Sequence, residues 1–259
     1  MTKMKNSRLL RISIFYILAF LSNIFRQELF GLDSFTENLP KWLVIAISPL
    51  QAIGIVIGAL VAINLMRKNK NAEYSFFGTS KLFSTLIALI PFILVVVFGF
   101  KNNIGINPHL YAIIPATSIL AYCFFEEIGW RGYLNDELGN LRQWQRFLLT
   151  GFLWWFWHLD FIGNPDIINN LIFLFILTAA AFGLGILLEH TKSVLTVSAF
   201  HTVVNILFLN HYYQEGMPTN HRLLIVGISV VLWVLILILW ERKHKKNKDE
   251  RSTMHNKRS

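Results

Sequence analysis

Two adjacent glutamates have the types and spacing that acid–base chemistry requires. Glu126 and Glu127 follow an apolar run, and Arg131 comes four residues after Glu127. On a helix, residues four apart face the same side, and Glu before Arg is the favourable order for an ion pair. Glu126 points about 100° away from Glu127 and has no charged partner nearby in the sequence. We therefore predict that Glu127 and Arg131 form a structural pair, and that Glu126 is a general base or acid.

Two histidines and an asparagine lie further along, each within an apolar stretch. His158 ends the run Trp154-Trp155-Phe156-Trp157-His158, and Asn205 follows His201 by four residues. Taken alone, His158 fits an interfacial histidine, His201 and Asn205 fit an interhelical hydrogen-bond pair, and the tryptophans fit core packing. The joint occurrence of these groups with the glutamate pair indicates a site instead.

The composition shows what kind of element must position these groups. The chain has 259 residues, of which 54% are hydrophobic and 15% are charged. Ordinary soluble domains carry roughly 25% charged residues, so disorder, a coiled coil and a typical soluble enzyme are excluded. The net charge of +9 is concentrated at the chain ends, where residues 241–259 hold eight Lys/Arg and three acidic residues. Such flanks are typical of membrane proteins, and nucleic-acid binding is not expected.

The apolar residues fall into about eight segments, and a spanning helix needs about 20 mostly apolar residues. The segments are 9–25, 42–66, 82–100, 110–127, 147–161, 168–189, 194–209 and 223–240. The fifth and seventh are short and interrupted by polar residues. The predicted fold is an all-α, polytopic membrane bundle of about eight transmembrane helices.

Lysine and arginine residues predict the orientation of this bundle. They are frequent in the N-terminal segment, in alternate loops and in the tail, and scarcer in the intervening loops. Cytoplasmic loops carry this excess, so both termini are predicted to be cytoplasmic in a multi-pass protein of the cell membrane. We expect one transmembrane domain over residues 1–240, embedded among membrane lipids, and a basic cytoplasmic tail over residues 241–259.

Ionisable groups at the centre of a spanning helix cost about 2.5–3.5 kcal/mol each. Glu126, His158, His201 and Asn205 are therefore predicted to converge on one cavity, which opens toward the cytoplasmic half. Because no proline interrupts residues 128–138, the helix that carries the glutamates is expected to continue past them.

Three motifs resemble those of the CAAX protease and bacteriocin-processing family (CPBP, Abi) of intramembrane endopeptidases. They are Glu126-Glu127-x-x-x-Arg131, Trp154-x-x-x-His158 and His201-x-x-x-Asn205, and they occur in the family's order. Trp154 stands where the family has phenylalanine, and Asp160 stands where many members have proline. Thr191-Lys192-Ser193 is similar to the family's Thr-x-Ser turn. The resemblance covers a core of about 110–210.

The resemblance implies hydrolysis of a peptide bond in a peptide or membrane-protein substrate. In the version we favour, no cofactor takes part. Glu126 activates a water that His158 holds, His201 and Asn205 donate to the oxyanion, and Glu127 and Arg131 support the helix. In the other version, Glu126, His158 and His201 bind zinc, which activates the water.

The competing interpretation is a non-catalytic membrane protein, either an immunity protein that binds a small peptide or a transporter. A transporter predicts an inverted repeat or paired broken helices, and the sequence shows neither. A pure binder needs no unpaired buried carboxylate facing two histidines. An endopeptidase therefore explains more of the residues.

Overall fold

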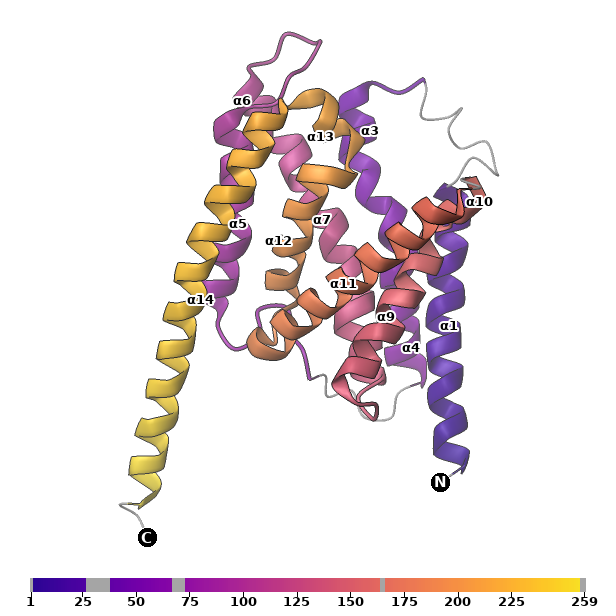
Figure 1. The fold of residues 1–259 in the computed structure, drawn as a ribbon, viewed down its shortest axis with the longest axis vertical. Coiled ribbons are helices and arrows are strands. Elements are labelled where there is room, and N and C mark those ends of the chain that lie inside the picture. The colour runs from indigo at the N-terminus through magenta and orange to yellow at the C-terminus, as the bar shows by residue number, and fades with distance from the viewer. Residues whose placement is uncertain (1, 27–37, 67–72, 164–165, 257–259) are drawn as a thin grey trace.

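The structure is a computed structural model, and it describes residues 2–26, 38–66, 73–163 and 166–256. Within these ranges the regular secondary structure is helical, apart from an isolated parallel β-bridge between Ser75 and Ser193. Most long helices run along the long axis of the molecule, and one crosses them diagonally (Figure 1). The predicted all-α membrane bundle is confirmed.

Every predicted apolar segment coincides with a helix. The helices are α1 (Thr2–Arg26), α3 (Lys41–Ile47), η2 (Ser48–Ala52), α4 (Ile53–Met66), α5 (Lys81–Phe98), α6 (Pro108–Tyr111), α7 (Ile113–Glu127), η3 (Ile128–Leu134), α8 (Asn135–Glu137), α9 (Gln143–His158), α10 (Asp160–Gly163), α11 (Ile167–Thr191), α12 (Val194–Val204), η4 (Asn205–Leu209), α13 (His211–Gly216) and α14 (Thr219–Asn256). In the described part of the chain, five helical stretches are long and apolar enough to cross a membrane, and residues 194–209 form a shorter apolar helix.

The helix that carries the glutamates continues past them, as predicted. After Glu127 the chain keeps its helical course through η3 and α8, but η3 is wound as a π-helix. Helix α12, which carries the third motif, also continues into a π-helix, η4, which begins at Asn205. Such π-helical segments frequently occur at functional sites.

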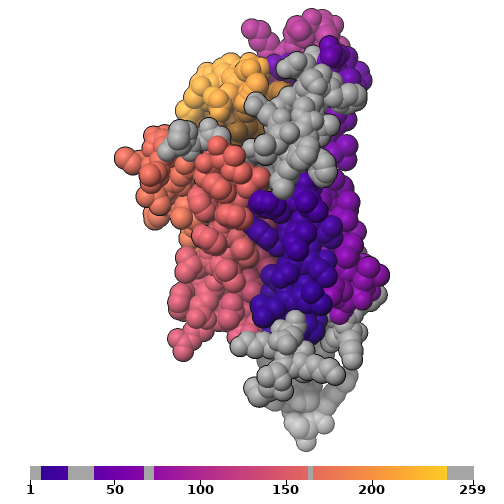
Figure 2. Space-filling model, turned by 90° about the vertical axis from the view of Figure 1, so that its right-hand side faces the viewer, coloured from indigo at the N-terminus to yellow at the C-terminus, as the bar shows by residue number. Residues whose placement is uncertain are grey.

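Helix α1 packs along α4 and lies at the surface between α4 and α9 (Figure 2). The close approach requires glycine, because a Cβ at Gly54 would lie 2.2 Å from the Ser22 Cβ. Small residues allow this kind of contact between membrane helices. Arg11 adds a polar anchor, since its Nε donates to the buried Glu137 at 3.0 Å.

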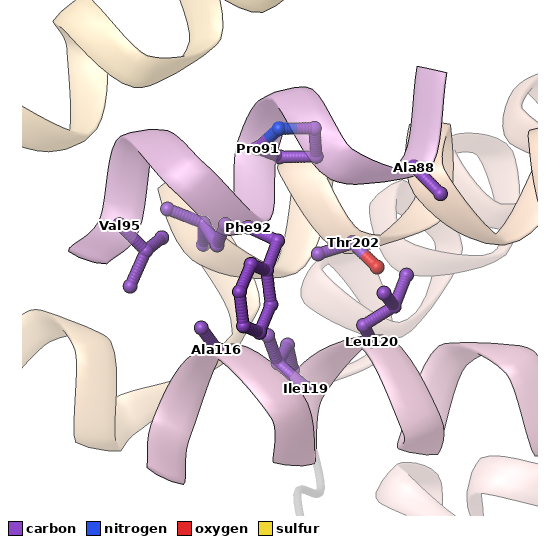
Figure 3. Close-up of a pocket in the computed structure, with 9 residues that line it drawn as sticks. Ala88, Pro91, Phe92, Val95, Ala116, Ile119, Leu120 and Thr202 are labelled. Carbon is purple, nitrogen blue, oxygen red and sulfur yellow. The ribbon is translucent and has the colours of Figure 1, made fainter. Parts of the chain in front are cut away.

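Helices α5, α7 and α12 meet at an apolar contact. Figure 3 shows Pro91 and Phe92 of α5 facing Ala116 and Ile119 of α7, with Thr202 of α12 beside them. The gap between these side chains has no room for a water molecule. This region is packing and holds the α7–α12 pair in place.

A segment that we call the strap, residues 73–80, crosses the start of α12. Its backbone pairs with the preceding turn, where Ser75 N–H donates to Lys192 O and Val194 N–H donates to Ser75 O, both at 3.0 Å. The side chain of Ser193 caps α12. The strap therefore fixes the position at which α12 begins.

The start of α1 and the end of α14 lie at the same end of the bundle, which we call the terminal end (Figure 1). Helices α6, α10 and α13 lie at the opposite, far end. The predicted tail from residue 241 begins as an extension of α14, which runs to Asn256. The basic loop 67–70, which we predicted to be cytoplasmic, lies outside the described residues.

Candidate active site

Trp154 lies at the centre of the predicted site. Its indole Nε1 donates to Glu126 Oε2 at 2.8 Å, and both side chains are buried. The ring centroid of Trp154 is 5.8 Å from that of His158 and 5.2 Å from that of His201. Both histidines interact electrostatically with Glu126. The structure thus gathers residues of all three motifs around one indole ring.

Glu127 is the shared partner of Arg131 and His201. Its Oε1 atom accepts from Arg131 Nη1 at 3.0 Å and from His201 Nδ1 at 2.9 Å, and all three residues are buried. The ion pair that the spacing predicts is present. The bond to His201 is a further contact, which the sequence did not indicate. The Arg131 guanidinium also lies over the Trp154 ring, 4.2 Å from its centroid.

The hydrogen bonds of the two histidines define which ring nitrogen is available for chemistry. His158 Nδ1 lies 2.8 Å from the backbone oxygen of Trp154, which can only accept, so Nδ1 carries a proton. His201 Nδ1 donates to Glu127 in the same way. In the neutral form of each ring, Nε2 is then the nitrogen with the lone pair. Leu159, at φ 60°, ends α9 directly after His158.

A large cavity of about 950 Å³ lies beside this cluster. Its wall includes Leu177, Ala180 and Leu187 of α11, His201 of α12, Trp240 of α14, and Trp154. The wall is mostly apolar and reaches Glu189 and Glu241 near the terminal end. The cavity therefore suits an apolar ligand that approaches the motif residues.

Asn205 lies elsewhere than predicted. Its Nδ2 atom donates to the backbone oxygen of His201 at 3.3 Å and lies 3.5 Å from Cys123 Sγ. It lines a second, smaller cavity, whereas His201 lines the large one. The prediction of one cavity shared by all four residues is thus wrong. Asn205 is one helical turn beyond His201, at the start of a π-helix, and its side chain points back to the backbone of His201.

The zinc version needs three ligands around one point. In the described residues, no group of three His, Cys, Asp or Glu side chains could hold a metal ion. The ring centroids of His158 and His201 lie 5.8 Å and 5.2 Å from that of Trp154, so both imidazoles contact the indole.

Sequence reasoning missed the role of Trp154, which was interpreted as core packing. Its position four residues before His158, where the resembling family has an aromatic residue, is the signal that could have identified it. Tyr122 was also missed, and it forms a hydrogen bond with Glu126 one turn later on α7. Asp160, the departure from the family pattern, is exposed at the start of α10.

Comparison with known proteins supports the motif assignment. Residues 107–207 match the family described as type II CAAX prenyl endopeptidase Rce1-like. CAAX prenyl protease 2 from Methanococcus maripaludis is 29% identical over 158 residues, which cover 56% of this chain and 54% of that relative. The chain thus matches about half the length of this relative. No solved structure matches the chain. The resemblance to CAAX proteases is confirmed, over a region that contains all three motifs.

Proposed function

We propose that this chain is an intramembrane endopeptidase of the CAAX-protease and bacteriocin-processing type, in which Glu126 activates water. The observation that carries the proposal is the different environment of the two glutamates. Glu127 is engaged by Arg131 and His201, while Glu126 is held by Trp154, which lines the large cavity. A positioned, buried carboxylate of this kind suits a general base.

The proposed reaction begins when Glu126 takes a proton from a water that Nε2 of His158 holds. The water oxygen bonds to the scissile carbonyl carbon, and the π electron pair of the carbonyl moves onto its oxygen. His201 acts as an imidazolium, whose charge the Glu127 carboxylate balances: Nδ1–H donates to Glu127 and Nε2–H donates to this oxyanion. Asn205 lines the smaller cavity and donates to the backbone oxygen of His201, so it supports the helix that carries His201. The C–N bond then breaks, and the proton on Glu126 passes to the leaving amine.

The large apolar cavity supports a substrate with a lipid-like or membrane-embedded part. A chain of apolar groups placed there would leave water, at about 0.8 kcal/mol per buried CH₂. The name of the relative from Methanococcus maripaludis points to prenylated peptides that end in Cys-a-a-X. We propose this substrate class first, and other membrane-bound peptides second.

The test uses the full chain in liposomes with a quenched fluorescent peptide that ends in a farnesylated Cys-a-a-X sequence. Wild type should cleave it, and Glu126→Gln should lower kcat by about 10²–10⁴ while remaining folded, because the side chain keeps its size but loses its base. The same peptide without the farnesyl group is the control for the apolar cavity.

Peptides from cells that express wild type or Glu126→Gln extend the test to other substrates. Mass spectrometry should find cleavage products that depend on wild type. If no such products appear and the farnesylated peptide stays intact, the non-catalytic interpretation, an immunity or transport protein for a small peptide, replaces the endopeptidase.

Metal analysis separates the two versions of the chemistry. The metal-free version predicts that wild type stays active after treatment with a zinc chelator and carries no stoichiometric zinc. The opposite result is one zinc per chain, with cleavage abolished when the zinc is removed and restored when it is returned. That result would overturn the metal-free version in favour of Glu126, His158 and His201 as zinc ligands.

A further inference from the structure

The smaller cavity has a different character from the large one. It measures about 310 Å³, and its wall includes Ser48, Gln51, Tyr122, Asn205, Asn210 and Tyr212. These residues come from η2, α7, η4 and the start of α13, so the cavity lies toward the far end of the bundle (Figure 1). Hydroxyl and amide groups of this kind both donate to and accept from water. A water takes about 30 Å³ in the liquid, so the cavity has room for several.

The two cavities approach each other at the predicted base. Glu126 is hydrogen-bonded to Trp154, which lines the large cavity, and to Tyr122, which lines the smaller one. On α12, His201 lines the large cavity, and Asn205, one turn later, lines the smaller one. Leu209 lines both. The Glu126 carboxylate is therefore one hydrogen-bond partner away from each cavity, through Trp154 on the apolar side and through Tyr122 on the polar side.

Hydrolysis consumes one water for each peptide bond, and that water must reach Glu126 while the substrate is bound. A substrate with a lipid-like part that fills the large cavity displaces water from it. The buried oxygen Oε2 of Glu127 and nitrogen Nη2 of Arg131 have no hydrogen-bond partner among the described residues. Buried polar groups of this kind are usually satisfied by ordered water.

We propose that the smaller cavity is a water route, which supplies the hydrolytic water to Glu126 from the far end while the large cavity holds the substrate. This inference rests on the proposed function, since it assigns the second reactant of the same site. The route passes Gln51, Tyr122 and Asn205 in the wall of the cavity.

A reversible block of the route tests the inference. Gln51 is exposed and lines the smaller cavity, so Gln51→Cys should be labelled by a bulky, charged methanethiosulfonate. We expect labelling to lower kcat for the farnesylated peptide at least fivefold, to leave KM within twofold, and to be reversed by a thiol reductant. Wild type, whose one cysteine, Cys123, is buried, controls for the reagent. Asn220→Cys, exposed near the start of α14, controls for a label at the far end.

A label in the other cavity should produce the opposite kinetic result. Ala180 lines the large cavity. A bulky apolar label on Ala180→Cys should therefore raise KM for the farnesylated peptide at least fivefold. If labelled Gln51→Cys keeps the wild-type kcat, the water route is overturned. If its KM rises instead, the smaller cavity belongs to the substrate site, which also overturns the inference.

Hydroxyl-radical footprinting gives a readout that needs no substrate. Radicals generated from water in proteoliposomes oxidise side chains beside bound water, so Tyr122 should be oxidised in wild type. Gln51→Trp, which narrows the cavity, should lower the oxidation of Tyr122 at least threefold. Tyr111, which is buried, is the reference side chain that should stay unoxidised in both proteins. Absence of oxidation at Tyr122 overturns the route. If Tyr122 is oxidised but the wild type cleaves no peptide, the proposed function is overturned, and the smaller cavity is a water-filled cavity without a role in hydrolysis.

Discussion

The indole N–H of Trp154 donates a 2.8 Å hydrogen bond to the carboxylate of Glu126. The two residues come from different helices, α9 and α7, and both are buried. Together with the hydrogen bond from Tyr122, this bond orients the carboxylate. The position of the Glu126 carboxylate therefore depends on where α9 lies relative to α7.

Trp154→Phe should separate this bond from the aromatic packing. Phenylalanine keeps an aromatic wall, as in the resembling family, but removes the donor. A hydrogen bond to a charged group is worth about 1.5–3 kcal/mol, so kcat/KM for the farnesylated peptide should fall about tenfold or more. Trp157→Phe is the matched control, because Trp157 is equally buried and donates to the backbone oxygen of Ala19. It should lower the melting temperature without this kinetic loss. Equal kinetic effects of the two changes would contradict the prediction.

Glu127→Gln and Arg131→Gln should both reduce stability. Each leaves a buried charge without its partner, which costs about 3–5 kcal/mol. The double change should cost less than the sum of the two single changes, because the residues are in direct contact. Thermal unfolding in detergent measures all three variants. Additive losses would show that the 3.0 Å ion pair is not energetically coupled.

Glu127→Gln should also affect the chemistry, since the variant weakens the acceptor for His201 Nδ1. Arg131→Gln leaves that bond in place. At a temperature where both variants are folded, Glu127→Gln should therefore have the lower kcat. The reverse order would indicate that Arg131, through its position over the Trp154 ring, matters more for the site.

Much of the fold follows from local sequence. The eight apolar segments are helices because their length and composition dictate it, and the Glu127–Arg131 pair follows from the four-residue helical spacing. The bond between Glu127 and His201 joins residues 74 positions apart, so it depends on how α12 packs against α7. No local pattern specifies that packing.

The division of the site into two cavities was equally inaccessible from the sequence. A four-residue spacing predicts that His201 and Asn205 share a helix face, but it says nothing of the π-helix that begins at Asn205. The aromatic type of Trp154 could be read from the sequence, whereas the partner of its N–H could not. The strap, residues 73–80, has little periodicity, and its place against α12 rests on backbone hydrogen bonds.

Gly78→Ala tests whether the strap positions α12. Gly78 has φ +59°, and a Cβ there would lie 2.1 Å from the backbone oxygen of Thr191. A residue with a side chain costs about 1–2 kcal/mol in this conformation, before the collision is counted. We expect a lower melting temperature and a lower kcat with little change in KM, because α12 carries His201. Gly227→Ala, where a Cβ meets nothing within 4 Å, is the control and should be harmless. A stable, fully active Gly78→Ala would contradict the role of the strap.

The hydrogen bonds of Lys192 to Glu73 and Glu189 predict that the stability of the protein depends on pH. Burial disfavours its charge, but hydrogen bonds to Glu189 and Glu73 outweigh burial and raise the pKa of Lys192 above its ordinary value. A raised pKa in the folded state gives stability that is fully present below the ordinary lysine pKa of about 10.4 and is lost as the pH rises through the folded pKa. The melting temperature of wild type should exceed that of Lys192→Met by a constant margin from pH 7 to about pH 9, and the margin should shrink above the ordinary lysine pKa. A margin that shrinks as the pH falls from about 9 to 7 would contradict this sign.

The last prediction concerns orientation in the membrane. The start of α1 and the end of α14 lie at the same end of the bundle, and residues 241–259 carry eight Lys/Arg and three acidic residues. Positive flanks remain in the cytoplasm, so the terminal end should be cytoplasmic and the far end external. Alkaline phosphatase, which is active only outside the cytoplasm, should be inactive when fused after Ser259. Inserted at Gly105, an open position in the exposed loop between α5 and α6, it should be active. A fluorescent protein that matures in the cytoplasm should give the converse pattern. Activity after Ser259 combined with inactivity at Gly105 would invert the topology, and activity at both positions would contradict an even number of spans.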